Sequence, residues 1–84
     1  MELQTSRDEN AEKSLLRIGM KGALNTDTAP GFEEALSEAV QENWQLLVLD
    51  MKELDYISSA GLRVIFKAAK QQKGEGRSLA VANR

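Results

Sequence analysis

The 84-residue sequence contains neither cysteine nor histidine. The lack of cysteine excludes disulfide bonds, a thiolate nucleophile and a zinc knuckle. The lack of histidine excludes Ser-His-Asp and Cys-His catalysis and the common histidine-ligated metal sites, so no metal or cofactor is expected. At this length we expect a single small domain over residues 1–84 with a mainly aliphatic core. The aromatic residues are few: Phe32, Trp44, Tyr56 and Phe66.

Long hydrophobic runs are also missing. The longest unbroken aliphatic run is Leu46–Leu49, which is far too short to span a membrane. Seven charged side chains lie within the first twenty residues, and a signal peptide does not tolerate them. A net charge of −2 argues against a general binder of nucleic acid or anionic membranes. The sequence therefore predicts a cytoplasmic protein that neither inserts into a membrane nor binds nucleic acid.

The charges are distributed unevenly along the chain. Residues 21–50 carry one basic and six acidic side chains, a balance of −5. Residues 51–84 carry seven basic and three acidic side chains, a balance of +4. Such a division suits docking onto a protein surface, but it is equally typical of solvated helix faces, which composition alone favours.

Hydrophobic patterns predict four strands. Leu16, Ile18 and Met20 alternate with polar residues, which is typical of a half-buried strand paired with the preceding strand in a hairpin. The run from Gln45 to Met51 has no alternation, as in a central parallel strand covered on both faces. The predicted strands are residues 2–7, 13–22, 45–51 and 78–82.

Apolar residues at helical spacing predict one helix after the second strand and another after the third. Thr28 is expected to cap the first helix, with Pro30 in its first turn and acidic side chains near its start. Trp44 and Tyr56 are expected to pack their rings inside the fold. The predicted core-facing residues are Phe32, Leu36, Ala39 and Val40 in the first helix, and Leu62, Ile65, Phe66 and Ala69 in the second.

The predicted order is therefore strand, strand, helix, strand, helix, strand. A helix that joins two parallel strands of one sheet implies a right-handed crossover. These patterns predict the α/β class, an α/β sandwich in which helices pack on a small mixed β-sheet.

The segment between the third strand and the second helix, predicted as a loop over residues 54–59, carries the functional information. It ends at a helix start with Ser58, Ser59 and Gly61. Backbone amides at a helix N-terminus attract anions, and a phosphate on serine would bring about −1.5 to −2 charges there. The alternative interpretation is that a serine caps the helix, which is a common placement of this residue and which composition alone favours.

Several short motifs occur along the chain in an order that matches a known protein family. Ser59-Ala60-Gly61-Leu62 follows a buried strand, and Asn25 and Thr28 precede the first helix. Through these segments nearly the whole chain resembles the STAS domain family and, within it, the bacterial anti-sigma-factor antagonists. The matching segments are 22–25, 28–29, 47–50, 54, 56–65 and 79–81.

The resemblance implies a binding protein without catalytic activity. Antagonists of this family bind an anti-sigma factor, usually also a serine kinase, and so release a sigma factor for transcription. The kinase phosphorylates a serine two positions before the glycine, here Ser59 with Ser58 less favoured, and a phosphatase resets the cycle. The residues implied in partner binding are Asn25, Thr26, Ser58, Ser59, Ala60, Gly61, Leu62 and Arg63.

The chain departs from the family pattern at two positions. Ser58 stands where many members have Asp, which removes a charge beside the acceptor serine. Asn25 also stands where Asp is frequent, and Asn keeps the turn chemistry without the charge. Two other functions stay open: a non-phosphorylated STAS subunit of a lipid or anion transporter complex, and a small-molecule sensor that uses the amides of residues 59–61.

The resemblance also makes the domain look abbreviated at its C-terminus. Family members usually continue beyond the strand that matches Leu79–Val81 with further helices. We therefore expect an exposed apolar patch around Leu79, Val81 and the neighbouring strand that is buried in a homodimer or a swapped assembly.

Overall fold

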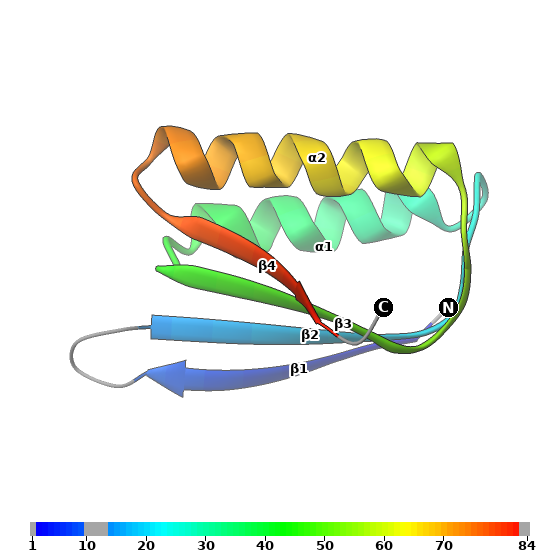
Figure 1. The fold of residues 1–84 in the computed structure, drawn as a ribbon, viewed down its shortest axis with the longest axis horizontal. Coiled ribbons are helices and arrows are strands. Elements are labelled where there is room, and N and C mark those ends of the chain that lie inside the picture. Colours follow the sequence, from blue (N-terminus) through cyan, green and yellow to red (C-terminus); the bar gives the residue numbers. More distant parts are fainter. Residues whose placement is uncertain (1, 10–13, 83–84) are drawn as a thin grey trace.

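The computed structural model describes residues 2–9 and 14–82 and has the predicted order β-β-α-β-α-β. Helices and strands form two layers, with both helices on one side of the sheet (Figure 1). The elements are β1 (Glu2–Glu9), β2 (Ser14–Leu24), α1 (Ala29–Gln41), β3 (Leu46–Ile57), α2 (Ser59–Gly74) and β4 (Ser78–Ala82).

The sheet is mixed, with the strand order β1-β2-β3-β4. β1 pairs antiparallel with β2 in a hairpin, whereas β3 lies parallel between β2 and β4. The central parallel position predicted for residues 45–51 is confirmed. The prediction that both faces of this strand are covered is wrong. Leu47 and Leu49 face the helices and are buried, whereas Leu46 and Val48 are only half-buried. No helix among the described residues covers that second face (Figure 1).

β3 runs to Ile57, and the loop predicted over residues 54–59 is therefore wrong. Leu54, Tyr56 and Ile57 still pair with β2, after two register shifts that each leave an extra residue on β3. Such bulges interrupt the alternation by which a strand is recognised from sequence. Tyr56 is 57% exposed rather than packed.

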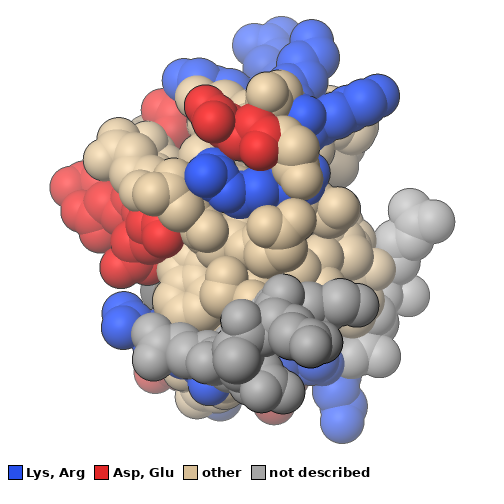
Figure 2. All heavy atoms as spheres, turned by 90° about the vertical axis from the view of Figure 1, so that its left-hand side faces the viewer, with Lys and Arg blue, Asp and Glu red and all other residues tan. Residues whose placement is uncertain are grey.

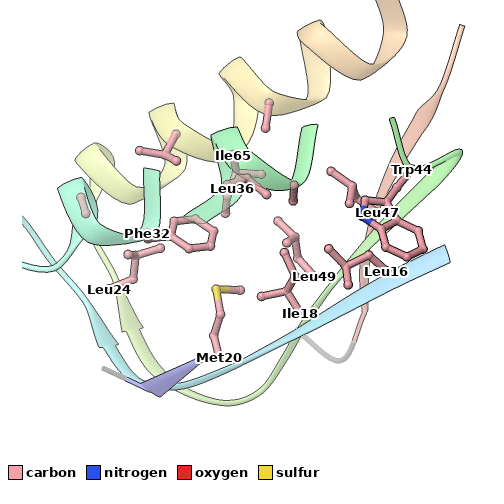
Figure 3. Close-up of a cluster of buried hydrophobic side chains, with 14 residues drawn as sticks. Leu16, Ile18, Met20, Leu24, Phe32, Leu36, Trp44, Leu47, Leu49 and Ile65 are labelled. Atoms are coloured by element: carbon pink, nitrogen blue, oxygen red, sulfur yellow. The ribbon is translucent and has the colours of Figure 1, made fainter. Parts of the chain in front are cut away.

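The core lies between the helices and the sheet (Figure 3). Leu16, Ile18 and Met20 are buried from β2 as predicted, and the α1 residues Phe32 and Leu36 lie above them. The Trp44 ring is also buried, as predicted, and its indole N–H donates to the Glu42 carboxylate over 2.9 Å. The fully buried Gln72 side chain donates to the carbonyls of Trp44 and Ser78, each over 3.0 Å, which ties α2 to the starts of β3 and β4.

The start of α1 and the buried side of α2 differ from expectation. Thr28 occupies the N-cap position of α1, but its side chain forms no capping bond because its hydroxyl donates to the Ala23 carbonyl over 2.9 Å. The first turn of α1 holds no acidic residue. In α2, Leu62 is 40% and Phe66 62% exposed, whereas Val64, Ile65, Ala68 and Gln72 are buried.

β4 lies at the edge of the sheet and pairs with β3. Val81 is 39% exposed, whereas Leu79 is half-buried against the core. Of the two residues named for the predicted apolar patch, Val81 is therefore exposed and Leu79 is not. A homodimer through this edge stays a prediction.

Candidate functional site

The N-terminal ends of α1 and α2 lie at the same end of the sheet, where β2 and β3 finish (Figure 1). The Ser58 N–H donates to the Leu24 carbonyl over 2.8 Å, which joins the end of β3 to the end of β2 immediately before α2. The carboxyl ends of strands are where open α/β sheets meet their ligands. The predicted site residues all belong to this end of the molecule.

Ser58 is the N-cap of α2. Its backbone is extended, with φ −91° and ψ 169°, and its hydroxyl oxygen accepts a hydrogen bond from the Gly61 N–H over 3.2 Å. Its carbonyl accepts from the Leu62 N–H over 3.0 Å, which begins the helix. Composition favoured a helix-capping role for a serine at this position. Ser58 has this role, and Ser59 does not cap the helix.

Ser59 is the first residue of α2 and its side chain is exposed. Its hydroxyl makes no hydrogen bond with the described part of the chain. A group attached to this hydroxyl would lie at the positive end of the helix dipole. Of the two serines, Ser59 is thus the one that an enzyme can reach without breaking the helix cap.

Gly61 allows the start of α2 to approach β2 closely. A Cβ atom on Gly61 would lie 2.6 Å from Cγ and 2.7 Å from Cδ2 of Leu24, and 3.3 Å from Cγ1 of Ile57. Contacts below 3.0 Å with the buried Leu24 require something to move. The motif glycine is therefore a packing requirement, and it directs this side of α2 toward the sheet.

Asn25 organises the turn that leads into α1. Its side-chain oxygen accepts hydrogen bonds from the Asp27 N–H at 2.9 Å and the Thr28 N–H at 3.1 Å. The Asn25 N–H in turn donates to the Thr28 hydroxyl over 2.8 Å. This is the turn chemistry expected for Asn at this position, and it leaves the next residue, Thr26, exposed.

A shallow groove of about 240 Å³ separates the first turns of the two helices. It brings together three of the predicted partner-binding residues, Thr26, Ala60 and Arg63. Ser58 and Asn25 instead direct their polar atoms into local backbone hydrogen bonds, and Gly61 is buried. The full lining is Thr26, Ala29, Pro30, Glu33, Ala60, Arg63 and Val64.

Beside the groove, four exposed residues of α2 form what we call the α2 strip: Ser59, Leu62, Arg63 and Phe66. Their spacing of three, four and seven residues places them on one face of the helix. Sequence reasoning missed Phe66 because it assigned this ring to the core. Gly61 could have corrected this assignment, because it lies on the buried side of the helix. Phe66 follows five positions later, and this spacing places it on a different side of the helix from Gly61.

Residues 5–84 match the STAS domain family, and the chain belongs to this family. The putative anti-sigma factor antagonist BtrV of Bordetella bronchiseptica is 44% identical over 52 residues. These residues make up 62% of this chain and 45% of BtrV, so the match spans less than half of that relative.

Solved structures show the same fold. An anti-sigma-factor antagonist STAS domain from Rhodobacter sphaeroides gives a TM-score of 0.74 at 13% identity, over 98% of this chain and 85% of that one. The phosphorylated form of the Bacillus cell fate determinant SpoIIAA gives 0.70 at 12% identity, over 94% and 68% of the two chains. At such identities the likeness concerns the fold alone. Neither helix of the described residues has the length and apolar character needed to cross a membrane.

Proposed function

We propose that this chain is an anti-sigma-factor antagonist that acts by binding and is switched off by phosphorylation of Ser59. The observation that carries the proposal is the exposed Ser59 hydroxyl at the head of α2, in a STAS domain with 44% identity to a putative antagonist. The partner is an anti-sigma factor that is also a serine kinase, and a phosphatase removes the phosphate. The chain itself catalyses no reaction in this proposal.

The α2 strip and the adjoining groove form the proposed partner surface. Leu62 and Phe66 offer exposed apolar area one turn apart, and Arg63 offers a bidentate donor beside them. Aromatic and arginine side chains are the usual centres of binding energy in interfaces. This combination fits a partner surface with an apolar pocket and a carboxylate.

A phosphate on Ser59 would act on the interface rather than on the fold. At the first residue of a helix, the added charge interacts favourably with the dipole and the free backbone amides. In the complex, the same hydrated dianion would have to lose water beside Leu62, and it would repel a partner carboxylate. A loss of about 1.4 kcal/mol already weakens binding tenfold.

Ser58 serves as the matched control for the test. The purified anti-sigma kinase of the same organism, given labelled ATP, should phosphorylate the wild type and Ser58→Ala but not Ser59→Ala. Labelling of Ser59→Ala at the wild-type rate would overturn the proposed site. A chain that takes up no phosphate, and whose stable complex with a transporter is unaffected by Ser59→Asp, would instead be the transporter subunit considered above.

A further inference from the structure

The two helices carry charges of opposite sign. All the charged side chains of α1 are acidic (Glu33, Glu34 and Glu38), and all those of α2 are basic (Arg63, Lys67, Lys70 and Lys73). The helices lie next to each other on one face of the sheet (Figure 1). Seen from the end at which they finish, acidic side chains gather on one side and basic side chains at the top, with a further acidic group between the basic ones (Figure 2). The outer face of the helix layer is therefore divided into a negative and a positive half.

The two halves lie level with each other along the helices. Lys67 Nζ is 3.9 Å from a carboxylate oxygen of Glu33, and both side chains are at least half exposed. Between the helices runs a groove of about 370 Å³, whose walls include Glu34 and Lys67. An exposed pair of this kind contributes about 0–1 kcal/mol, so both charges stay available to an outside partner.

We infer that this face binds a second copy of the chain. A partner must present a positive strip beside a negative strip at the same spacing, and the chain itself presents both. With a twofold axis parallel to the helices, α1 of each copy faces α2 of the other, and both contacts join opposite charges. With the axis across the helices, α1 would face α1 and like charges would meet. Charge complementarity therefore selects one symmetric arrangement.

The register of the charges suits this arrangement. Rotation about an axis parallel to the helices preserves the level of each residue. Because Glu33 and Lys67 are level within one copy, Glu33 of one copy and Lys67 of the other are level across the interface. The dimer would also cover Arg63 in the α2 strip, so that self-association and the proposed partner complex should compete. The inference itself follows from the charges of the helices and does not rest on the proposed function.

Charge reversal provides the test, with sedimentation equilibrium as the measurement. The 84-residue chain should dimerise at low salt, and its dissociation constant should rise about tenfold or more between low and high salt. Glu33→Lys/Glu34→Lys makes α1 positive, because only Glu38 stays acidic. Lys67→Glu/Lys70→Glu/Lys73→Glu makes α2 negative, because only Arg63 stays basic. Each variant alone should be monomeric, whereas an equimolar mixture should associate again, because both helix contacts then join opposite charges.

Val81→Lys serves as the matched control because it changes the edge of β4, the other surface considered for a homodimer. It should leave the dissociation constant unchanged. A wild-type chain that stays monomeric at about 1 mM in low salt, charge variants that dimerise as well as the wild type, or a dimer broken only by Val81→Lys would each overturn the inference. Circular dichroism should show every variant folded.

The natural absence of cysteine allows the symmetry to be tested directly. Glu34→Cys and Lys70→Cys variants, mixed and oxidised, should form the mixed disulfide between positions 34 and 70 in preference to either homodimeric disulfide. A preference for the disulfide between two copies of position 34 would overturn the parallel axis.

Discussion

At the scale of single residues, Gly61 decides how α2 lies on the sheet. The space that its Cβ would need is occupied by Leu24, at 2.6 and 2.7 Å. With Gly61 against the sheet, Val64, Ile65 and Ala68 follow on the buried side. Leu62 and Phe66 lie outside this buried side and are exposed.

Gly61→Ala should lower the free energy of unfolding by about 1–3 kcal/mol, because the new methyl group overpacks the contact with Leu24. Gly31→Ala is the matched control in α1, where a Cβ atom meets nothing within 4 Å, and it should raise the free energy of unfolding by about 0.5–1 kcal/mol. Urea unfolding of both variants measures the difference. Equal effects of the two substitutions would contradict the packing role of Gly61.

The two adjacent serines should differ in the same assay. Ser58→Ala removes the acceptor of the Gly61 N–H and should cost about 1 kcal/mol of stability, as loss of an N-cap usually does. Ser59→Ala removes an exposed hydroxyl and should change stability by less than about 0.5 kcal/mol. A larger loss from Ser59→Ala than from Ser58→Ala would show that the cap is assigned to the wrong serine.

At the scale of elements, the phase of α2 distinguishes two phenylalanines that have the same pattern in sequence. Phe32 of α1 lies in the core, whereas Phe66 of α2 is 62% exposed beside Leu62. Both occur at helical spacing with other apolar residues, and only the neighbouring elements separate their roles. An exposed aromatic ring on the same face of α2 as Ser59, the proposed switch residue, is better explained by binding than by stability.

Alanine substitution of the two rings should separate these roles. Phe32→Ala should lower the free energy of unfolding by about 3–5 kcal/mol, because it leaves a cavity in the core. Phe66→Ala should change it by less than about 0.5 kcal/mol while weakening partner binding about tenfold or more. Urea unfolding and calorimetric titration measure the two effects. A stable Phe66→Ala variant with unchanged affinity would remove Phe66 from the proposed surface.

At the scale of the whole molecule, the proposed switch changes a surface and leaves the fold intact. Ser59 lies where the helix layer meets solvent, outside the core between α1, α2 and the sheet. A charge added there therefore has no buried neighbours to displace. The proposed switch therefore differs from regulation by unfolding, because the modified protein keeps its core intact.

Ser59→Asp should accordingly keep or slightly raise the free energy of unfolding, by up to about 1 kcal/mol, since an acidic residue in the first turn suits the helix dipole. The same variant should bind the anti-sigma factor at least about tenfold more weakly than the wild type. Ser59→Asn, of similar size and without the charge, is the control and should keep most of the affinity. Unfolding of Ser59→Asp would contradict a switch that acts at the surface.

The sequence by itself determined the order of the elements, the apolar face of β2, the central place of β3 and the opposite charges of the two helices. These features depend on residue types and on spacing within one element, which a local pattern records. The motif around Gly61 also predicted a site at the start of the second helix, and that site stays a prediction.

Only the tertiary structure decided which sides of these elements are covered. The bulges that carry β3 to Ile57 depend on pairing with β2, and the phase of α2 depends on the contact of Gly61 with Leu24. These contacts join residues that are far apart in the chain, and no periodicity within one element encodes them. The tertiary structure therefore assigned the cap to Ser58 and left Ser59 and Phe66 exposed on one face of α2.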